Sequence, residues 1–196
     1  MKLHQLTWQE ICQMIPKRKA DAQKGDFGRL LCITGSRNMP GACLLSTQAA
    51  AGGAGLVTVA TAPEIPMRLA AAAPEAMWLP LETDKAGFLR SSDQNRKTLE
   101  KQLSRANAVL LGCGLGVTEE TRRLVHWVLE QAVCPVVLDA DGLNCAVSCI
   151  ELSRRTGKDW ILTPHPGEMA RLTGRSIPQI QENRVETATQ FAAAIR

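Results

Sequence analysis

Continuous apolar runs alternate with longer helix-like stretches along this chain from residue 29 onward. Within each run the apolar residues are not interleaved with polar ones, which is typical of strands that are covered on both faces. Five segments have this pattern: residues 29–34 (RLLCIT), 55–61 (GLVTVAT), 108–112 (AVLLG), 135–140 (PVVLDA) and 160–164 (WILTP). The pattern predicts parallel strands.

The stretches between these runs carry helix-forming residues, with apolar positions at three- and four-residue spacing. Helices are therefore predicted in residues 41–51, 64–73, 93–106 and 118–132. The resulting order of strand, helix, strand, helix is typical of an α/β fold with a layered, mainly parallel sheet. The length of 196 residues fits a single domain, and residues 1–196 contain no repeat or linker.

The last twenty residues, 177–196, read as one amphipathic helix. Its apolar positions can face a core; they are Ile177, Ile180, Val185, Ala188, Phe191 and Ile195. This helix is followed by neither a glycine cap nor a further strand, although the rest of the chain alternates regularly. We therefore expect the domain to be incomplete, with its C-terminal part missing from these residues.

Composition limits the compartment and excludes a membrane span. A hydrophobic fraction of 45% and a charged fraction of 21% are ordinary for a globular protein. No window is apolar enough to cross a bilayer, and the N-terminus lacks the continuous apolar region of a signal peptide. The odd count of seven cysteines indicates a reducing compartment. The sequence thus predicts a cytoplasmic protein, and it is compatible with a homo-oligomer.

The cysteines are predicted to be structural. Cys32, Cys113 and Cys134 lie in or beside strand-like runs, where they act as small buried hydrophobes. Cys145 and Cys149 are spaced to share a helix face, but the chain has no CxxC pair and only three histidines. This composition argues against a zinc site.

The net charge of +4 is mild, and its densest cluster precedes the first strand: Lys17, Arg18, Lys19 and Lys24. A solvated segment is the simplest interpretation of this cluster. Nucleic-acid binding usually requires a basic face with interleaved aromatics, whereas this chain has no Tyr and three Phe. The composition argues against a nucleic-acid partner and remains compatible with a phosphorylated small molecule.

Ligands of open α/β sheets collect beyond the carboxyl ends of the strands, so the residues that follow each run carry the candidate chemistry. After the first run comes GSRNMPGA, in which Gly41 and Ala42 begin the next helix with little side-chain bulk. The backbone amides there could face an anionic or polar ligand. A tight strand-to-helix turn explains the same residues equally well.

The fourth helix is preceded by GCGLG, with glycines at 112, 114 and 116. The dinucleotide fingerprint GxGxxG would need another glycine where Val117 stands, so that motif is absent. Without a Cβ, Gly114 and Gly116 still let the backbone approach a flat or phosphorylated ligand. Ordinary loop geometry is the alternative.

Two carboxylates follow the run at 135–138, in the motif DADGLN. Asp139 and Asp141 could attract a divalent ion or orient a ligand hydroxyl. An aspartate in this position also often caps the next helix, so both interpretations stay open.

The run at 160–162 is followed by TPHPGE, which places His165 between two prolines. Pro166 suits a first helical turn, and Glu168 lies near the positive end of that helix, so neither needs a functional explanation. His165 is left unexplained by the same argument. Restrained at the ligand edge, its imidazole can donate a hydrogen bond to a phosphate or an amide.

As a set and in this order, these loops resemble those of the NAD(P)H-hydrate dehydratase family. This is the ribokinase-like domain found as the carboxy-terminal part of nicotinamide nucleotide repair proteins. The resemblance rests on KGDFGRLLCITGS, GACLLSTQAA, GAGLVTV, LLGCGLG, DADGLN and TPHPGEMARL. The family commonly has GPGLG where this chain has GCGLG, and a basic or bulky residue before GAGLV where this chain has AAGG.

The resemblance implies a ribokinase-like layered sandwich that repairs hydrated nicotinamide cofactors. The substrate would be (6S)-NADHX or NADPHX, dehydrated with ADP or ATP as co-substrate and Mg²⁺. Ala42, Gly114, Gly116 and His165 would contact the hydrate. Glu168 resembles the Glu of the TPNxxE segment of related vitamin kinases, so it would support the phosphate or metal, as could Asp139 and Asp141.

Family members continue with a nucleotide-binding strand and a GTGD-type loop, which forms an anion hole and supplies the Asp thought to act as base. No residue up to Arg196 corresponds to that loop. We therefore expect the catalytic residue to lie outside this chain, which is either a fragment or has lost catalysis. Two alternatives are a ribokinase-like vitamin kinase and a non-catalytic nucleotide-binding remnant.

Overall fold

The computed structural model describes residues 4–15, 17, 19–151 and 159–195. Six strands form one sheet in the order β3-β2-β1-β4-β5-β6, and every neighbouring pair is parallel. The strands are β1 (Arg29–Ile33), β2 (Leu56–Thr61), β3 (Met77–Pro80), β4 (Ala108–Leu111), β5 (Val136–Leu138) and β6 (Trp160–Leu162). All five predicted strands are confirmed, and the predicted α/β class with a parallel sheet is confirmed with them.

The third strand was not predicted from the sequence. β3 is only four residues long, its burial alternates little, and both Met77 and Pro80 are exposed. Its residues MWLP are apolar, but the run is short, partly exposed and contains a proline, so it lacks the pattern of a buried central strand. β3 is defined by its parallel pairing with β2, which runs from Thr58 opposite Met77 to Thr61 opposite Pro80.

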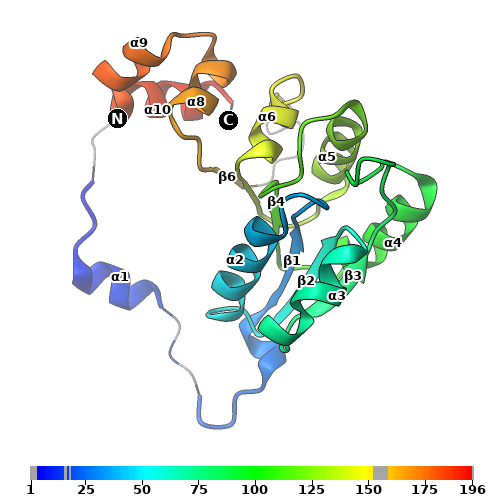
Figure 1. Ribbon diagram of the computed structural model, residues 1–196. Helices are drawn as coiled ribbons and strands as arrows, with labels where there is room; N and C mark the ends of the chain where they lie inside the picture. Colours follow the sequence, from blue (N-terminus) through cyan, green and yellow to red (C-terminus); the bar gives the residue numbers. More distant parts are fainter. Residues whose placement is uncertain (1–3, 16, 18, 152–158, 196) are drawn as a thin grey trace.

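The described helices are α1 (Trp8–Met14), α2 (Pro40–Ala51), α3 (Glu64–Leu69), α4 (Asp93–Leu103), α5 (Glu119–Gln131), α6 (Asp141–Ala146), α8 (Pro166–Thr173), α9 (Ile177–Glu182) and α10 (Arg184–Ala194), with 3-10 turns at η1 (Lys24–Phe27) and η2 (Ala70–Ala72). Helices α2 to α6 lie between consecutive strands, whereas α1 precedes β1 and α8 to α10 follow β6 (Figure 1). The four predicted helices are confirmed as α2, α3 with η2, α4 and α5. None of the described helices is both long and apolar enough to cross a membrane.

The predicted C-terminal helix is two helices, so that prediction was wrong. The chain leaves helical geometry at Asn183, where φ is −136° and ψ is 55°. Asn is a poor helix former because its side chain competes for backbone groups. Ile180 is buried, and Phe191 and Ile195 pack partly against the core. The other three predicted core positions are exposed: Ile177, Val185 and Ala188. Arg196 lies outside the described residues.

The N-terminal segment contains a helix that the sequence did not lead us to predict. The start of α1 is capped reciprocally by Thr7 and Glu10, and none of its residues is buried. Figure 1 shows α1 lying apart from the sheet. In the basic cluster that follows, Lys17, Lys19 and Lys24 are exposed, in agreement with a solvated segment, and Arg18 lies outside the described residues.

In β1 and β2 burial increases toward the carboxyl end of the strand. In β1, Arg29 is exposed while Leu31, Cys32 and Ile33 are at most 2% exposed. Cys32 and Cys134 are buried as predicted, whereas Cys113 is only half-buried. Burial raises the pKa of the Cys32 thiol to about 12, so this side chain stays neutral. The residues that follow β1 and β2 therefore extend from the buried core.

Candidate active site

The loops that follow β1 and β4 are joined to each other. The amide of Gly35 donates to the carbonyl of Cys113 at 2.8 Å. The chain runs from β1 outward to β2 and β3 and then returns to β4 on the other side of β1. The gap between β1 and β4 is therefore the point where the strand order reverses, and open α/β sheets bind their ligands there.

Ala42 and Gly114 lie against each other at this point. A Cβ on Gly114 would stand 2.8 Å from the Ala42 Cβ and 2.9 Å from the Met39 Cβ, and the φ of Gly114 is +69°. Both its conformation and its surroundings therefore require glycine. The structure thus brings together two of the residues that the sequence pointed to, on loops that are 72 positions apart in the numbering.

The start of α2 has no side-chain cap. Its N-cap residue is Met39, and Pro40 occupies the first turn. The amides of that turn have no partner within the helix, and they are available to an acceptor outside it. Gly41 is exposed, with no atom within 4 Å of where a Cβ would stand. The helix start beside Gly114 is therefore open.

Gly116 is fixed by contacts from several elements. Its amide donates to Asp141 Oδ2 at 2.8 Å, and its carbonyl accepts from Thr121 Oγ1 at 3.0 Å. A Cβ there would stand 2.2 Å from the Phe88 ring. Asp141 is the first residue of α6, which has no side-chain cap, so the capping interpretation of Asp141 was wrong. Its carboxylate holds the glycine loop because it accepts a hydrogen bond across the sheet edge.

Asp139 links the ends of three strands. Its Oδ1 accepts from Thr163 Oγ1 at 2.7 Å, and its Oδ2 accepts from the Cys113 thiol at 3.3 Å. Burial, followed by this hydrogen bond to Asp139, raises the pKa of Cys113 to about 12, which keeps the thiol protonated as a donor. Asp139 does not cap α6 either. Both of its oxygens are engaged within the protein.

The turn between the two aspartates is strained. Ala140 has φ +50° and ψ −120°, and it is the one residue other than glycine with a positive φ among those described. A Cβ on Gly112 would stand 2.0 Å from the carbonyl oxygen of Asp139. The loop after β4 therefore packs closely against this turn. Such strain persists where the surroundings fix the backbone, which is common at functional sites.

His165 caps α8, which the sequence argument did not foresee. Its Nδ1 accepts from the amides of Gly167 at 3.0 Å and Glu168 at 3.4 Å, while Glu168 Oε2 accepts from the amide of His165 at 2.9 Å. This is a reciprocal capping box. The expectation that helix capping leaves His165 unexplained was wrong, because an imidazole nitrogen can accept from the first turn as a Ser or Asp oxygen does.

The other ring nitrogen of His165 also faces Glu168. Nε2 lies 3.2 Å from Glu168 Oε1, so both carboxylate oxygens contact the histidine. The His165 side chain is 63% exposed and that of Glu168 only 6%. Glu168 is thus a buried positioning group, and the imidazole is the part that a ligand can reach.

A hollow of about 540 Å³ opens beside this capping box, between the end of β6 and the C-terminal helices. It is lined by Leu162, Thr163, Pro164, Pro166, Met169, Ile180, Arg184, Val185 and Ala188. Thr163 is also the hydroxyl that binds Asp139. The hollow therefore adjoins the edge on which Asp139 and His165 stand.

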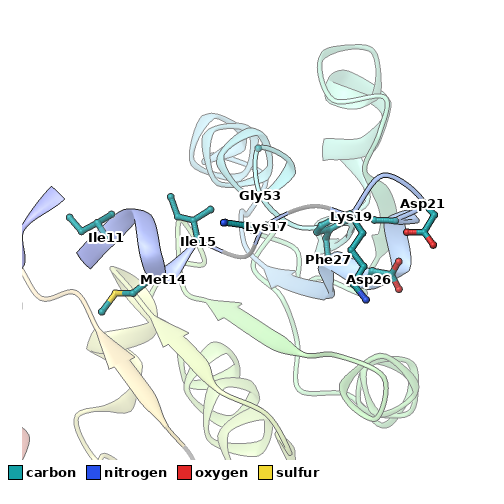
Figure 2. Close-up of a pocket in the computed structure, with 11 residues that line it drawn as sticks. Ile11, Met14, Ile15, Lys17, Lys19, Asp21, Asp26, Phe27 and Gly53 are labelled. Carbon is teal, nitrogen blue, oxygen red and sulfur yellow. The ribbon is translucent and has the colours of Figure 1, made fainter. Parts of the chain in front are cut away.

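A second hollow lies elsewhere. It has a volume of about 910 Å³ and lies between α1, η1 and the end of α2. Ile11, Phe27 and Gly53 are among the lining residues (Figure 2). Phe27 precedes β1 and Gly53 follows α2, so this space adjoins the amino ends of the strands. None of the predicted site residues lines it.

The three predicted carboxylates do not gather into a metal site. Among the residues that the structure describes, no group of three His, Cys, Asp or Glu side chains is placed to hold a metal ion. Asp139, Asp141 and Glu168 are each engaged with protein donors. Cys145 and Cys149 are both buried, and burial raises the pKa of Cys149 to about 11.

Several residues at this edge were missed or passed over. Phe88, against Gly116, and Glu64, bound to Arg37, carry no local signal because each meets its partner through the fold. Thr163 and Arg37 stood inside motifs that the sequence singled out, but neither received a role. A polar residue directly after a strand was the signal that could have found Thr163.

Comparison with known proteins points to one family. A family model described as NAD(P)H-hydrate dehydratase matches residues 30–196. The chain is 39% identical over 182 residues to the bifunctional NAD(P)H-hydrate repair enzyme Nnr of Coxiella burnetii, covering 92% of this chain and 34% of that protein. It is 33% identical over 191 residues to the ADP-dependent (S)-NAD(P)H-hydrate dehydratase of Bacillus subtilis, covering 97% and 63%.

Solved structures agree. The ADP/ATP-dependent NAD(P)H-hydrate dehydratase of Bacillus subtilis, co-crystallised with ATP/Mg²⁺, matches with a TM-score of 0.74 at 30% identity, over 96% of this chain and 62% of that one. A ribokinase-like superfamily protein of Enterococcus faecalis shares the fold, with a TM-score of 0.77 at 24% identity over 100% of this chain and 66% of that one. This chain therefore spans between a third and two thirds of these proteins, and it belongs to the NAD(P)H-hydrate dehydratase family.

Proposed function

We propose that this chain binds the hydrated nicotinamide nucleotides NADHX and NADPHX and serves their ADP- or ATP-dependent dehydration. The observation that supports this most directly is the contact between Ala42 and Gly114 at the reversal of strand order, beside the uncapped start of α2. Such an edge has backbone donors and no side-chain bulk, which suits a large, flat, phosphorylated ligand.

The proposed reaction converts a poor leaving group into a good one. The substrate hydroxyl attacks the terminal phosphorus of ADP, and AMP departs, which leaves a phosphate ester on the nicotinamide ring. The ring nitrogen then expels phosphate, and a proton leaves the adjacent carbon to form the double bond. The sum is hydrate plus ADP giving NADH, AMP and phosphate, with no change of oxidation state.

The residues of this chain would bind and orient the hydrate. Ala42, Gly114 and Gly116 would let the backbone approach the ligand, and the exposed ring of His165 would contact it from the neighbouring loop. Glu168 would hold that ring in place. We assign the base to none of the described carboxylates, because Asp139 and Asp141 already accept hydrogen bonds from protein donors.

Mg²⁺ would neutralise charge on the transferred phosphoryl group. The described residues do not fit a resident ion, since no three ligands gather there. The three carboxylates proposed for phosphate or metal support would therefore act by orienting the loops that surround the phosphate. No step of the proposed mechanism depends on a metal held by this chain alone.

The test of the proposal is turnover and binding by the purified chain. With NADHX, ADP and Mg²⁺, recovery of reduced-nicotinamide absorbance together with AMP and phosphate would establish the reaction. Binding of NADH without turnover would restrict the chain to the substrate-binding part. A stable phosphorylated product would instead indicate a vitamin-kinase-like transferase, and no binding of any nicotinamide nucleotide would refute the proposal.

A matched pair of variants in α2 tests whether NADH binds beside Ala42. Ala42→Val adds bulk against Gly114, whereas Ala49→Val makes the same change at an exposed position of the same helix. Both share the small helix-propensity cost of a β-branched residue. We expect Ala42→Val to weaken NADH binding about tenfold, roughly 1.4 kcal/mol, and Ala49→Val to leave it unchanged. Thermal unfolding of both variants separates lost binding from lost structure.

We further propose that the protein works in the cytoplasm and associates with itself. Cys32, Cys43 and Cys145 are buried as free thiols, which fits a reducing compartment. Large exposed apolar side chains outside the candidate site, such as Trp8, Leu45 and Met67, favour self-association. Sedimentation across a concentration series tests the oligomer, and fractionation of cells that produce the protein tests the compartment.

A further inference from the structure

Arg37 and Glu64 form an ion pair at the carboxyl ends of β1 and β2. Glu64 Oε1 accepts from Arg37 Nε at 2.8 Å and lies 2.7 Å from Arg37 Nη2. The two side chains are 40% and 31% exposed, whereas Glu64 Oε2 itself is buried. A hydrogen bond from the backbone amide of Glu64 itself, followed by the one from Arg37, lowers the pKa of the Glu64 carboxyl, which keeps it an anionic acceptor.

The pair adjoins the candidate active site from two directions. Arg37 lies on the β1 loop, between Gly35, which binds Cys113, and Ala42. Its amide donates to the carbonyl of Gly87 at 3.1 Å, and Nη1 donates to the carbonyl of Lys85 at 2.9 Å.

The turn that contains Lys85 and Gly87 continues to Phe88, whose ring packs on Gly116. Arg37 thereby connects Glu64 to both glycine loops that are proposed to hold the substrate.

Unused hydrogen-bonding capacity is concentrated at this pair. Among the described residues, three buried side-chain nitrogen or oxygen atoms have no hydrogen-bond partner, and two of them are Ser36 Oγ and Glu64 Oε2. Ser36 is 1% exposed and directly precedes Arg37. Buried polar atoms are nearly always paired, so two unpaired ones around a single arginine indicate that a ligand group completes them.

We propose that Glu64 Oε2 accepts a hydrogen bond from a ribose hydroxyl of the nucleotide substrate and that the Arg37–Glu64 pair selects an unmodified 2′-hydroxyl over a 2′-phosphate. Glu64 follows β2 at the carboxyl end of the sheet, where open α/β sheets bind their ligands, and a carboxylate oxygen is a suitable acceptor for a sugar hydroxyl. Ser36 Oγ serves the same sugar. This inference rests on the proposed function and adds a preference for NADHX over NADPHX.

Charge gives the preference its direction. The Glu64 carboxylate repels a 2′-phosphate, and the Arg37 guanidinium that could attract it is already neutralised. Replacing Glu64 by Gln removes the repulsion, frees the arginine and adds a donor for phosphate oxygens. The substitution should therefore move selectivity toward the phosphorylated nucleotide.

The experiment titrates the full chain with NADH and with NADPH, following nicotinamide fluorescence. We expect the wild type to bind NADH about tenfold more tightly than NADPH, and Glu64→Gln to abolish or invert that ratio. Glu119→Gln removes the carboxylate of another Arg–Glu pair, Arg123–Glu119 at 3.1 Å on α5, and should leave the ratio unchanged. Ser36→Ala removes only an unpaired hydroxyl, so it should fold normally and weaken NADH binding about threefold.

The outcomes separate this inference from the proposed function. If the wild type binds neither nucleotide, the proposed function fails and the inference fails with it. If both bind and Glu64→Gln leaves their ratio unchanged, the ribose assignment is overturned while the proposed function stands. Should Glu64→Gln fail to fold, the Ser36→Ala titration decides, and unchanged NADH affinity there overturns the assignment as well.

Discussion

Two helices that start at the same edge of the sheet are built in opposite ways. α2 follows β1 and begins without a side-chain cap, with the backbone of Gly114 packed against its first turn. α8 follows β6 and begins with a reciprocal box in which His165 and Glu168 bind each other's backbone amides. Both helices have a proline in the first turn, so proline is not the cause of the difference.

The difference shows which parts of the edge are available to a ligand. At α8 the first amides are occupied, so this loop can offer only the outer face of an imidazole. At α2 no side chain caps the first turn, and a glycine loop forms the neighbouring surface. The N-terminus of α2 can bind a ligand with backbone groups, whereas the N-terminus of α8 positions the side chain of His165. The predictions below test this division.

The largest loss of stability is expected from Gly114→Ala, because this glycine packs against the first turn of α2. The new Cβ would meet both Ala42 and Met39 below 3 Å, and the φ of +69° adds conformational strain. We expect the free energy of unfolding to fall by about 2–3 kcal/mol in urea denaturation. Gly25→Ala, where nothing lies within 4 Å, serves as the control and should change it by less than about 0.5 kcal/mol. Equal losses in both variants would contradict the close packing of α2 on the glycine loop.

A smaller loss is expected from Glu168→Ala, which removes the buried carboxylate of the second start. The amide of His165 and its Nε2 would both lose their acceptor. Loss of a capping side chain that leaves a partly buried donor unpaired costs about 1–2 kcal/mol. Chemical denaturation measures this loss, and Glu182→Ala, at an exposed position of α9, is the matched control. Stability unchanged in Glu168→Ala would mean that the box does not hold α8.

The sequence predicted that the site lies at the carboxyl end of the sheet, but it did not predict how the N-termini of α2 and α8 are capped. Continuous apolar runs predict buried parallel strands such as β1 and β4. The carboxyl ends of these strands lie at one edge of the sheet, so Ala42 and Gly114 could be assigned to that edge from the sequence. The use of His165 as a cap depends on which ring nitrogen faces the backbone, and residue type does not determine that. Arg37 and Glu64 are 27 positions apart, and no local pattern connects them.

The smallest stability effect, and the sharpest test of the division, comes from two substitutions of His165. His165→Ala removes the acceptor for the first amides of α8 and should cost about 1 kcal/mol, while His165→Asn restores an excellent N-cap acceptor and should cost less than about 0.5 kcal/mol. If the imidazole also contacts the nucleotide, both variants lose NADH affinity, although only the alanine variant loses stability. Fluorescence titration and urea unfolding of the same samples give the two readouts. An asparagine variant that binds NADH like the wild type would show that His165 serves only to cap its helix, and ligand recognition at this edge would then belong to α2 and the glycine loop.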